Sequence, residues 1–262
     1  MFSHFIAAFI ATFLPIIGYL FLLPFLLVLL LTYLNRSSKQ MLVNQFGLQA
    51  QVYLGGLGII LHETSHLLTA LLFHHKIIGF KLVVLPWHLN ANSSEQALGY
   101  VQHASTKRLW PTLGNLFIGI APIFGCTAAM YLSTYLLLPT TYQRLNAFIM
   151  APTGDSLQWL LSSFGQAFSS FPLLLIWLLL MINITLGGFD LSSADFKNSA
   201  SGVLPALLLV LVISCLLTFL GLSRSTTSLV KRAGLLIASW LILSVIISGL
   251  LNALLRLLRL AH

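Results

Sequence analysis

The sequence predicts an all-α membrane protein, with residues 1–262 forming one multi-pass domain, and two observations lead to this class. Hydrophobic residues make up 58% of the chain and charged residues only 7%, with a mean hydropathy of +0.96. A soluble domain carries about 25% charged residues, so this chain has too few to cover an aqueous surface. Several apolar runs also approach the roughly 20 residues that a helix needs to cross a bilayer. We therefore expect a lipid bilayer around the chain, and a location in the cell membrane.

The apolar runs predict about six transmembrane helices. They cover about residues 5–34, 48–73, 113–138, 171–186, 203–222 and 234–255. The polar residues 35–40 predict a break after the first helix, and residues 139–170 are mixed in polarity, with a turn expected at 152–155. Residues 81–85 and 98–101 alternate in part and flank the turn-forming residues 90–94, which favours a β-hairpin or a β-like loop.

The charged residues and the two cysteines exclude other classes of protein. Thirteen Lys and Arg against five Asp and Glu give a formal charge of +8. The basic residues are scattered between and at the ends of apolar runs, where they meet lipid headgroups. A nucleic-acid-binding protein would cluster them on one soluble face, so we expect no nucleic acid partner. Cys126 and Cys215 lie in separate apolar runs without a metal-binding spacing, and we expect both to be small buried hydrophobic residues.

The second apolar run contains His62-Glu63-Thr64-Ser65-His66. Residues four apart lie on one face of a helix, so the two imidazoles can bind one zinc ion. Glu63, on the adjoining face, can take a proton from the attacking water. Ionisable residues in a lipid-spanning helix are costly and usually mark a functional site. The alternative is a hydrogen-bonded cluster that only packs helices together.

Two glycines and four histidines outside this motif have simpler interpretations. Gly55 and Gly58 continue the His62/His66 stripe, where small residues let a neighbouring helix approach closely. His74 and His75 end the motif run, so we expect them to be solvated at the membrane interface. The polar loop positions of His88 and His103 explain them without any chemistry.

A catalytic zinc usually has three protein ligands, so one more is expected. The remaining acids are Glu95, Asp155, Asp190 and Asp195. The first two lie in turn-like loops, whereas Asp190 and Asp195 follow the glycine break at 187–188, which can bring a carboxylate to the metal. Asp195 has a second interpretation, because residues 192–195 read as a capping box that opens the fifth helix.

The motif and the downstream aspartate together resemble the site-2 protease family of intramembrane zinc metalloproteases. The resemblance covers about residues 50–200, within a protease-like core of about 48–222. It implies that His62 and His66 are zinc ligands, that Glu63 is the general base, and that a downstream aspartate is the third ligand. It also implies a membrane-associated β-hairpin after the motif helix, which residues 78–103 fit.

The chain departs from the family pattern in two places. The usual downstream stretch contains Asn-Pro and ends in Leu-Asp-Gly, whereas here Asn183 precedes Asp190 without a proline and Leu191 follows. Residues 192–195 are more similar to the Ser-x-x-Asp variant of divergent small bacterial members. The family's Gly-Pro-x-x-Asn element is similar to residues 121–125 with the asparagine replaced, and Asn115 is a candidate substitute.

We expect Asp195, rather than Asp190, to be the third ligand, because the first turn of a helix holds a carboxylate more rigidly than a glycine-rich loop. The predicted function is zinc-dependent hydrolysis of peptide bonds in a membrane-anchored protein substrate. The alternative is a non-hydrolytic metal-binding membrane protein, either a transporter or a degenerate protease that acts as a binder. A transporter should carry ionisable residues along several spans, and a pure binder has no need of Glu63.

Overall fold

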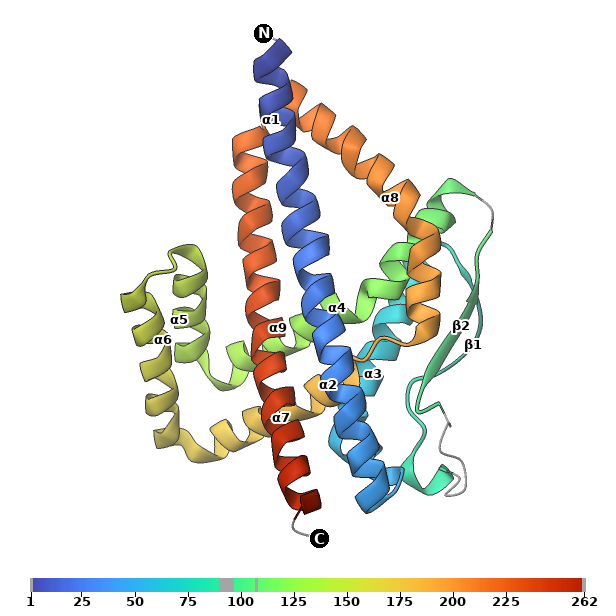
Figure 1. Cartoon of the computed structure of the whole chain (residues 1–262), viewed down its shortest axis with the longest axis vertical. Helices are drawn as coiled ribbons and strands as arrows, with labels where there is room; N and C mark the ends of the chain where they lie inside the picture. The colour runs from blue at the N-terminus through green and yellow to red at the C-terminus, as the bar shows by residue number, and fades with distance from the viewer. Residues whose placement is uncertain (1, 90–96, 107, 261–262) are drawn as a thin grey trace.

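The structure, a computed structural model, describes residues 2–89, 97–106 and 108–260, most of which are helical. A long rod runs along one side, formed by α1 (Phe2–Pro15), a π-helical stretch (Ile16–Leu22) and α2 (Leu23–Phe46). α9 (Ser223–Leu260) lies beside this rod, and the two ends of the chain lie at opposite ends of the molecule (Figure 1). Pro24 has no N–H for the carbonyl four residues earlier, so the π-helical stretch ahead of it accommodates the lost bond.

The predicted break at residues 35–40 is wrong, because α2 continues through it to Phe46. Two of its polar side chains, Asn35 and Ser38, are buried and bonded to other helices, so these polar groups do not need water and the helix can continue. Asn35 Nδ2 donates to the Thr185 carbonyl at 2.8 Å, and Asn252 Nδ2 donates to Ser38 Oγ at 3.1 Å. The chain turns only at Gly47, whose φ of 78° is favourable for glycine.

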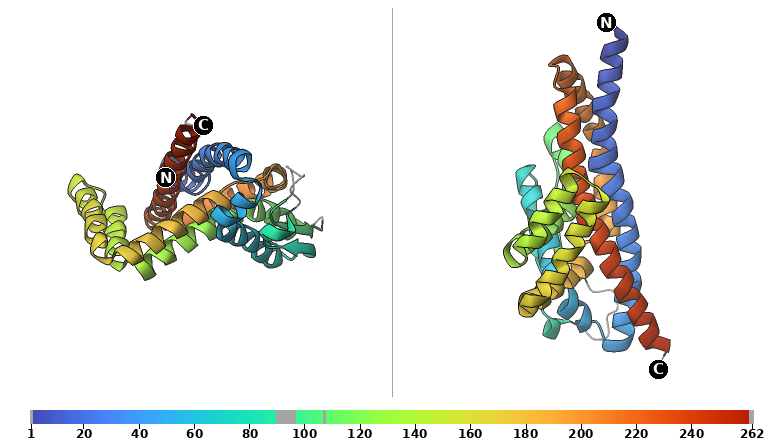
Figure 2. Two further views of the ribbon diagram at one scale, coloured as in Figure 1. Left: turned by 90° about the horizontal axis from the view of Figure 1, so that it is seen from below. Right: turned by 90° about the vertical axis from the view of Figure 1, so that its left-hand side faces the viewer.

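The interior is built from α3 (Gln49–Leu72), α4 (Leu109–Leu137), α7 (Phe171–Gly188) and α8 (Ser193–Phe219). α3 packs against both α4 and α7, α4 packs against α8, and Figure 2 shows α4 and α7 side by side. A Cβ on Gly55 would lie 3.1 Å from Gly187 Cα. The close helix approach predicted for the glycine stripe is confirmed, and the neighbouring helix is α7.

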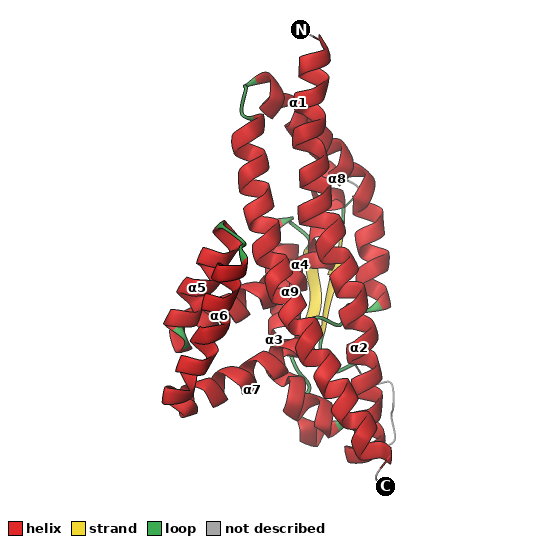
Figure 3. Ribbon diagram, turned by 60° about the vertical axis from the view of Figure 1, so that its left-hand side comes forward, coloured by secondary structure: helices red, strands yellow, loops and turns green. Residues whose placement is uncertain are grey.

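The sheet has two antiparallel strands, β1 (Lys76–Lys81) and β2 (Tyr100–Ala104), shown in yellow in Figure 3. The chain between them contains a short 3₁₀ helix (Pro86–His88). Of the residues expected in a β-hairpin or β-like loop, 82–85 are not in a strand, since β1 ends at Lys81. The predicted turn at 90–94 and the candidate Glu95 lie outside the described residues, and a closed, membrane-associated hairpin stays a prediction.

Residues 139–170 form a helical arm that projects to one side of the molecule (Figure 1) and contacts α4 and α9 through its first helix. It consists of α5 (Pro139–Met150), α6 (Gly154–Ala167) and a 3₁₀ turn (Phe168–Ser170) leading into α7. The expected turn lies between α5 and α6. Some of the polar residues in this stretch join the two helices of the arm. The Arg144 side chain of α5 donates hydrogen bonds to the Trp159 carbonyl and to the Gln166 side chain of α6.

Within the described residues, five helical stretches are long and apolar enough to cross a membrane, as expected of a membrane protein. They are Phe2–Phe46, Leu109–Leu137, Gly154–Gly188, Ser193–Phe219 and Ser223–Leu258. α3 forms as predicted but is not among them, because its glutamines and the His62–His66 motif lower its hydropathy. Six spans are therefore not confirmed. Cys126 is buried as expected, whereas Cys215 is exposed because only one side of α8 packs against the other helices.

Candidate metal centre

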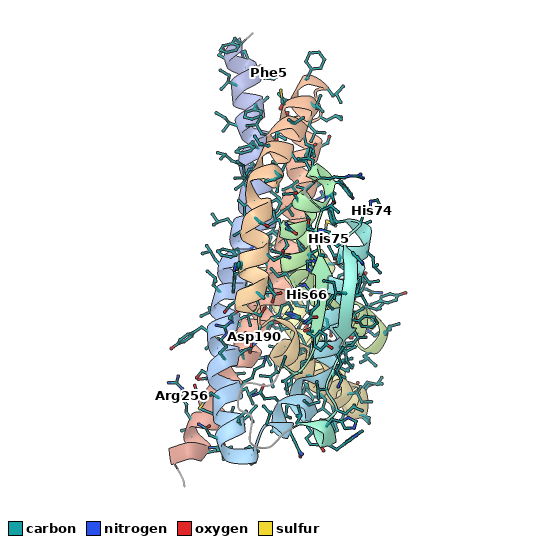
Figure 4. The ribbon with its side chains drawn as sticks, turned by 90° about the vertical axis from the view of Figure 1, so that its right-hand side faces the viewer. Phe5, His66, His74, His75, Asp190 and Arg256 are labelled. Carbon is teal, nitrogen blue, oxygen red and sulfur yellow. The ribbon has the colours of Figure 1, made fainter. Side chains whose placement is uncertain are left out.

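Three side chains from two helices converge in the interior. His62 and His66 come from α3, and Asp195 comes from the first turn of α8. Their possible ligand atoms all lie within 4.8 Å of one another. The two Nε2 atoms are 3.0 Å apart, and the Asp195 carboxylate lies 3.2 Å from His66 Nε2 and 3.7 Å from His62 Nε2. His66 lies between α8 and the strands (Figure 4).

The His62 ring is held by the end of α7. Its Nδ1 lies 2.9 Å from the Gly188 carbonyl oxygen. This carbonyl is in the last turn of α7, where backbone acceptors lack a partner within the helix. A carbonyl can only accept a hydrogen bond, so Nδ1 carries the proton and Nε2 presents its lone pair. The contact depends on glycine, because a Cβ on Gly58 would lie 2.6 Å from the Gly188 nitrogen.

The His66 ring is held in the same way by α4. Its Nδ1 lies 2.7 Å from the Ile118 carbonyl oxygen. Within an α-helix this oxygen would accept the N–H of residue 122, but Pro122 has none. The proline therefore leaves an acceptor free at the position where His66 needs one. As with His62, the bond leaves the Nε2 lone pair facing the centre.

Asp195 both caps α8 and faces the histidines. Its Oδ2 accepts hydrogen bonds from Ser192 N and Ser192 Oγ, both at 2.7 Å, and Ser192 Oγ accepts from Asp195 N. The capping box predicted from residues 192–195 is confirmed. α8 lies so close to α4 at this point that a Cβ on Gly119 of α4 would be only 2.6 Å from the Asp195 carbonyl oxygen. The capping turn and this close approach together fix the direction of the carboxylate.

The chemistry of these donors fits a divalent metal ion. Two imidazole nitrogens and a carboxylate oxygen form a donor set that suits zinc and related metals. Hydrogen bonds from the far ring nitrogens to backbone carbonyls are the usual support of metal-binding histidines. His62 and His66 are only 6% and 5% exposed, so an ion here would be shielded from bulk water. The buried His62–His66–Asp195 group could therefore hold a metal ion.

Glu63 lies next to this group but is not part of it. It is half-buried on α3, beside the start of β2. A Cβ on Gly99 would lie 2.8 Å from Glu63 Cγ, so a glycine here leaves room for the glutamate side chain. The motif thus separates into two metal-facing imidazoles and one carboxylate on the adjoining face, next to the sheet.

Asp155 and Asp190, the other candidate acids that lie in the described part of the chain, do not join the group. The Asp190 carboxylate is occupied by α2, because Arg36 Nε lies 3.2 Å from its Oδ1 and Lys39 Nζ lies 2.9 Å from its Oδ2. Figure 4 shows Asp190 on the side of α2. Asp155 is exposed in the first turn of α6. Asn115, the candidate substitute for the family's asparagine, donates to Ser201 Oγ on α8.

The expectation that His75 is solvated is wrong. It is buried, its Nε2 lies 2.9 Å from the Pro111 carbonyl oxygen, and its Nδ1 lies 2.8 Å from His103 Nδ1. Because Pro111 O can only accept, His75 Nε2 carries its proton and His103 Nδ1 donates to His75. Burial, with the neighbouring His75, lowers the pKa of His103 below its ordinary value. His74 is exposed at the end of α3, as expected.

Asn183 of α7, which the sequence marks only by its distance from Asp190, bonds to the backbone of α3. Its Oδ1 accepts hydrogen bonds from Leu57 N at 2.8 Å and Gly58 N at 3.3 Å, and its Nδ2 donates to the Tyr53 carbonyl at 3.2 Å. These bonds join α7 to α3 one turn before the motif. A lone asparagine in an apolar run is the signal that could have revealed it.

The chain matches no family model, no curated protein and no solved structure.

Proposed function

We propose that this chain is an intramembrane zinc metalloprotease, similar to the site-2 protease family, that hydrolyses peptide bonds of membrane-anchored proteins. One observation carries the proposal: the Nε2 atoms of His62 and His66 face the Asp195 carboxylate, with Glu63 beside them. Three protein donors suit a catalytic zinc, which keeps a further position for water or substrate. In this proposal α3 is a sixth membrane span, buried among its neighbours.

The reaction assigns a separate role to each residue. Bound zinc would supply Lewis-acid polarisation of the scissile carbonyl. His62, His66 and Asp195 hold the ion, while Gly188 and Ile118 orient the rings through their carbonyls. Glu63 accepts a proton from the attacking water and returns it to the nitrogen of the leaving amine. Glu63 is free for this role because it is not one of the three convergent donors.

The substrate we propose is an extended segment of a membrane-anchored protein. Gly99, at the start of β2, lies against Glu63, so a strand added along β2 would pass the general base. Main-chain hydrogen bonds to a strand edge hold a peptide with little demand on its sequence. The resemblance to the site-2 protease family supports the same location for the substrate.

An apolar cavity next to the centre supports a membrane-embedded substrate. Its volume is about 390 Å³, and it lies between the π-helical stretch, α4 and α8. Phe21 and Phe25 line one wall, and Phe196, the neighbour of Asp195, lines another. Cavities of roughly 300–1,000 Å³ accommodate ligand-sized groups. We propose that apolar side chains flanking the cleaved bond enter it.

The test is cleavage of single-span substrates by the protein purified in detergent. We expect cleavage that stops on metal chelation and returns when zinc is restored. His62→Ala should lose both metal and cleavage, whereas His88→Ala, a change at an exposed histidine of the loop, should keep both. If metal binds but no substrate in a broad panel is cleaved, the protein is a metal binder and the protease assignment is wrong.

A further inference from the structure

One stripe of α2 faces the segment that carries the metal centre. This stripe consists of Thr32 and the residues three, four and seven positions after it, which are Asn35, Arg36 and Lys39. At this spacing they lie on one face of the helix. All four side chains bond to the end of α7 or to the loop that joins it to α8. Three of the five acceptors are backbone carbonyls, and one of them, that of Thr185, is in the last turn of α7, where carbonyls lack a partner within the helix.

The upper half of this stripe holds the end of α7. Asn35 Nδ2 donates to the Thr185 carbonyl at 2.8 Å, and Thr32 Oγ1 donates to the Phe189 carbonyl at 3.4 Å. Gly188 lies between Thr185 and Phe189. Its carbonyl faces away from α2 and accepts a hydrogen bond from the His62 ring. The last turn of α7 is therefore bonded to α2 on one side and to the metal centre on the other.

The lower half holds the loop. Arg36 Nη2 donates to the Leu191 carbonyl at 2.8 Å, and its Nε lies 3.2 Å from Asp190 Oδ1. Lys39 Nζ lies 2.9 Å from Asp190 Oδ2, and the side chains of Lys39 and Asp190 are each only 16% exposed. A partly buried pair of this kind is screened less than a surface pair. Four residues after Leu191, the chain reaches Asp195.

We propose that Arg36, Lys39 and Asp190 form a clamp that positions the metal-binding segment. Asp190 is thereby a positioning residue and not a ligand. The clamp fixes the short chain between Gly188, which orients His62, and Asp195, which faces both histidines. The inference rests on the metal centre of the proposed function but not on peptide hydrolysis. It also makes the position of α2 a determinant of metal affinity, although α2 contributes no donor to the convergent group.

Titration of the purified full chain with Co²⁺ tests the clamp, because the visible spectrum of this ion reports its coordination. Asp190→Asn should weaken Co²⁺ binding by about 10-fold and alter the spectrum, as loss of a supporting contact does. Asp190→Glu, which keeps the charge, should restore much of the affinity. Asp155→Asn is the matched control, since it removes an exposed carboxylate on the α6 arm, and it should leave affinity and spectrum unchanged.

A double-mutant cycle separates positioning from general destabilisation. Lys39→Met should weaken Co²⁺ binding, and its combination with Asp190→Asn should cost less than the two single effects added, because both remove one interaction. The proposed clamp is refuted if Asp190→Asn binds Co²⁺ as tightly as Asp155→Asn does. It is also refuted if the effects of Lys39→Met and Asp190→Asn on Co²⁺ binding are additive. Complete loss of metal with Asp190→Asn but not with Asp195→Asn would make Asp190 the ligand. A protein that binds Co²⁺ normally but cleaves nothing would refute only the protease function.

Discussion

Gly58→Ala should weaken metal binding, although Gly58 is not itself one of the proposed metal ligands. An added Cβ would lie 2.6 Å from both the Asn183 carbonyl oxygen and the Gly188 nitrogen. Real Cβ atoms essentially never come closer than 3.0 Å, and ordinary contact begins near 3.4 Å, so α3 and α7 must separate by about 0.4–0.8 Å. The obstructing atoms are backbone and cannot rotate away. A shift of that size stretches the 2.9 Å bond between His62 Nδ1 and the Gly188 carbonyl to the limit of hydrogen-bonding distance or beyond it.

Gly56→Ala is the matched control on the same helix. An added Cβ there would meet only Val52 Cγ1, at 3.5 Å, which is an ordinary contact. Both changes gain roughly 1 kcal/mol of helix propensity, while Gly58→Ala adds an overpacking cost of about 1–3 kcal/mol. In a metal titration we expect Gly58→Ala to bind at least about 10-fold more weakly than Gly56→Ala. Equal affinities would refute the argument that glycine packing sets the His62 ring.

Three further predictions follow from the geometry. Pro122→Ala supplies an N–H that competes for the Ile118 carbonyl, so the same titration should show metal binding weakened by up to about 10-fold; Pro205→Ala, in α8, should show no change. The pKa of His103 in the folded chain is below its ordinary value of 6.5. Between the folded and the unfolded pKa the unfolded chain therefore binds more protons, and the folded state loses stability as the pH falls through this range. The midpoint temperature of thermal unfolding should therefore fall less between pH 7 and pH 5 for His103→Gln than for the wild type or for His88→Gln. If α3 lies in the membrane, Thr64→Cys in a cysteine-free background should react with a charged thiol reagent more slowly than His88→Cys; equal rates would place α3 at the surface.

The parts of the centre that could be predicted from the sequence are those encoded within one turn of helix. The spacing of His62 and His66 places both rings on one face, and residues 192–195 specify their own capping box. The glycine stripe at 55 and 58 indicated a close neighbour, although not that this neighbour was α7. Each of these inferences needed only local geometry.

The features that were missed depend on partners far apart in the chain. α2 continues through 35–40 because its buried polar groups bond to distant helices, Asn35 to α7 and Ser38 to α9. Asp190 is bound by Arg36 and Lys39 across a similar separation, and no local pattern distinguishes this pairing from metal ligation. His75 is buried because Pro111 O and His103 satisfy both its ring nitrogens. Tertiary contacts decided each case.

The most direct test of the central claim is a paired measurement of bound metal and cleavage rate for Glu63→Gln. Gln keeps the shape of the side chain but cannot accept the proton, and Glu63 is not among the convergent donors. We predict wild-type metal content and a cleavage rate lowered by at least about 100-fold, the usual contribution of a general base. A variant that cleaves at the wild-type rate with its metal bound would contradict the proposed mechanism.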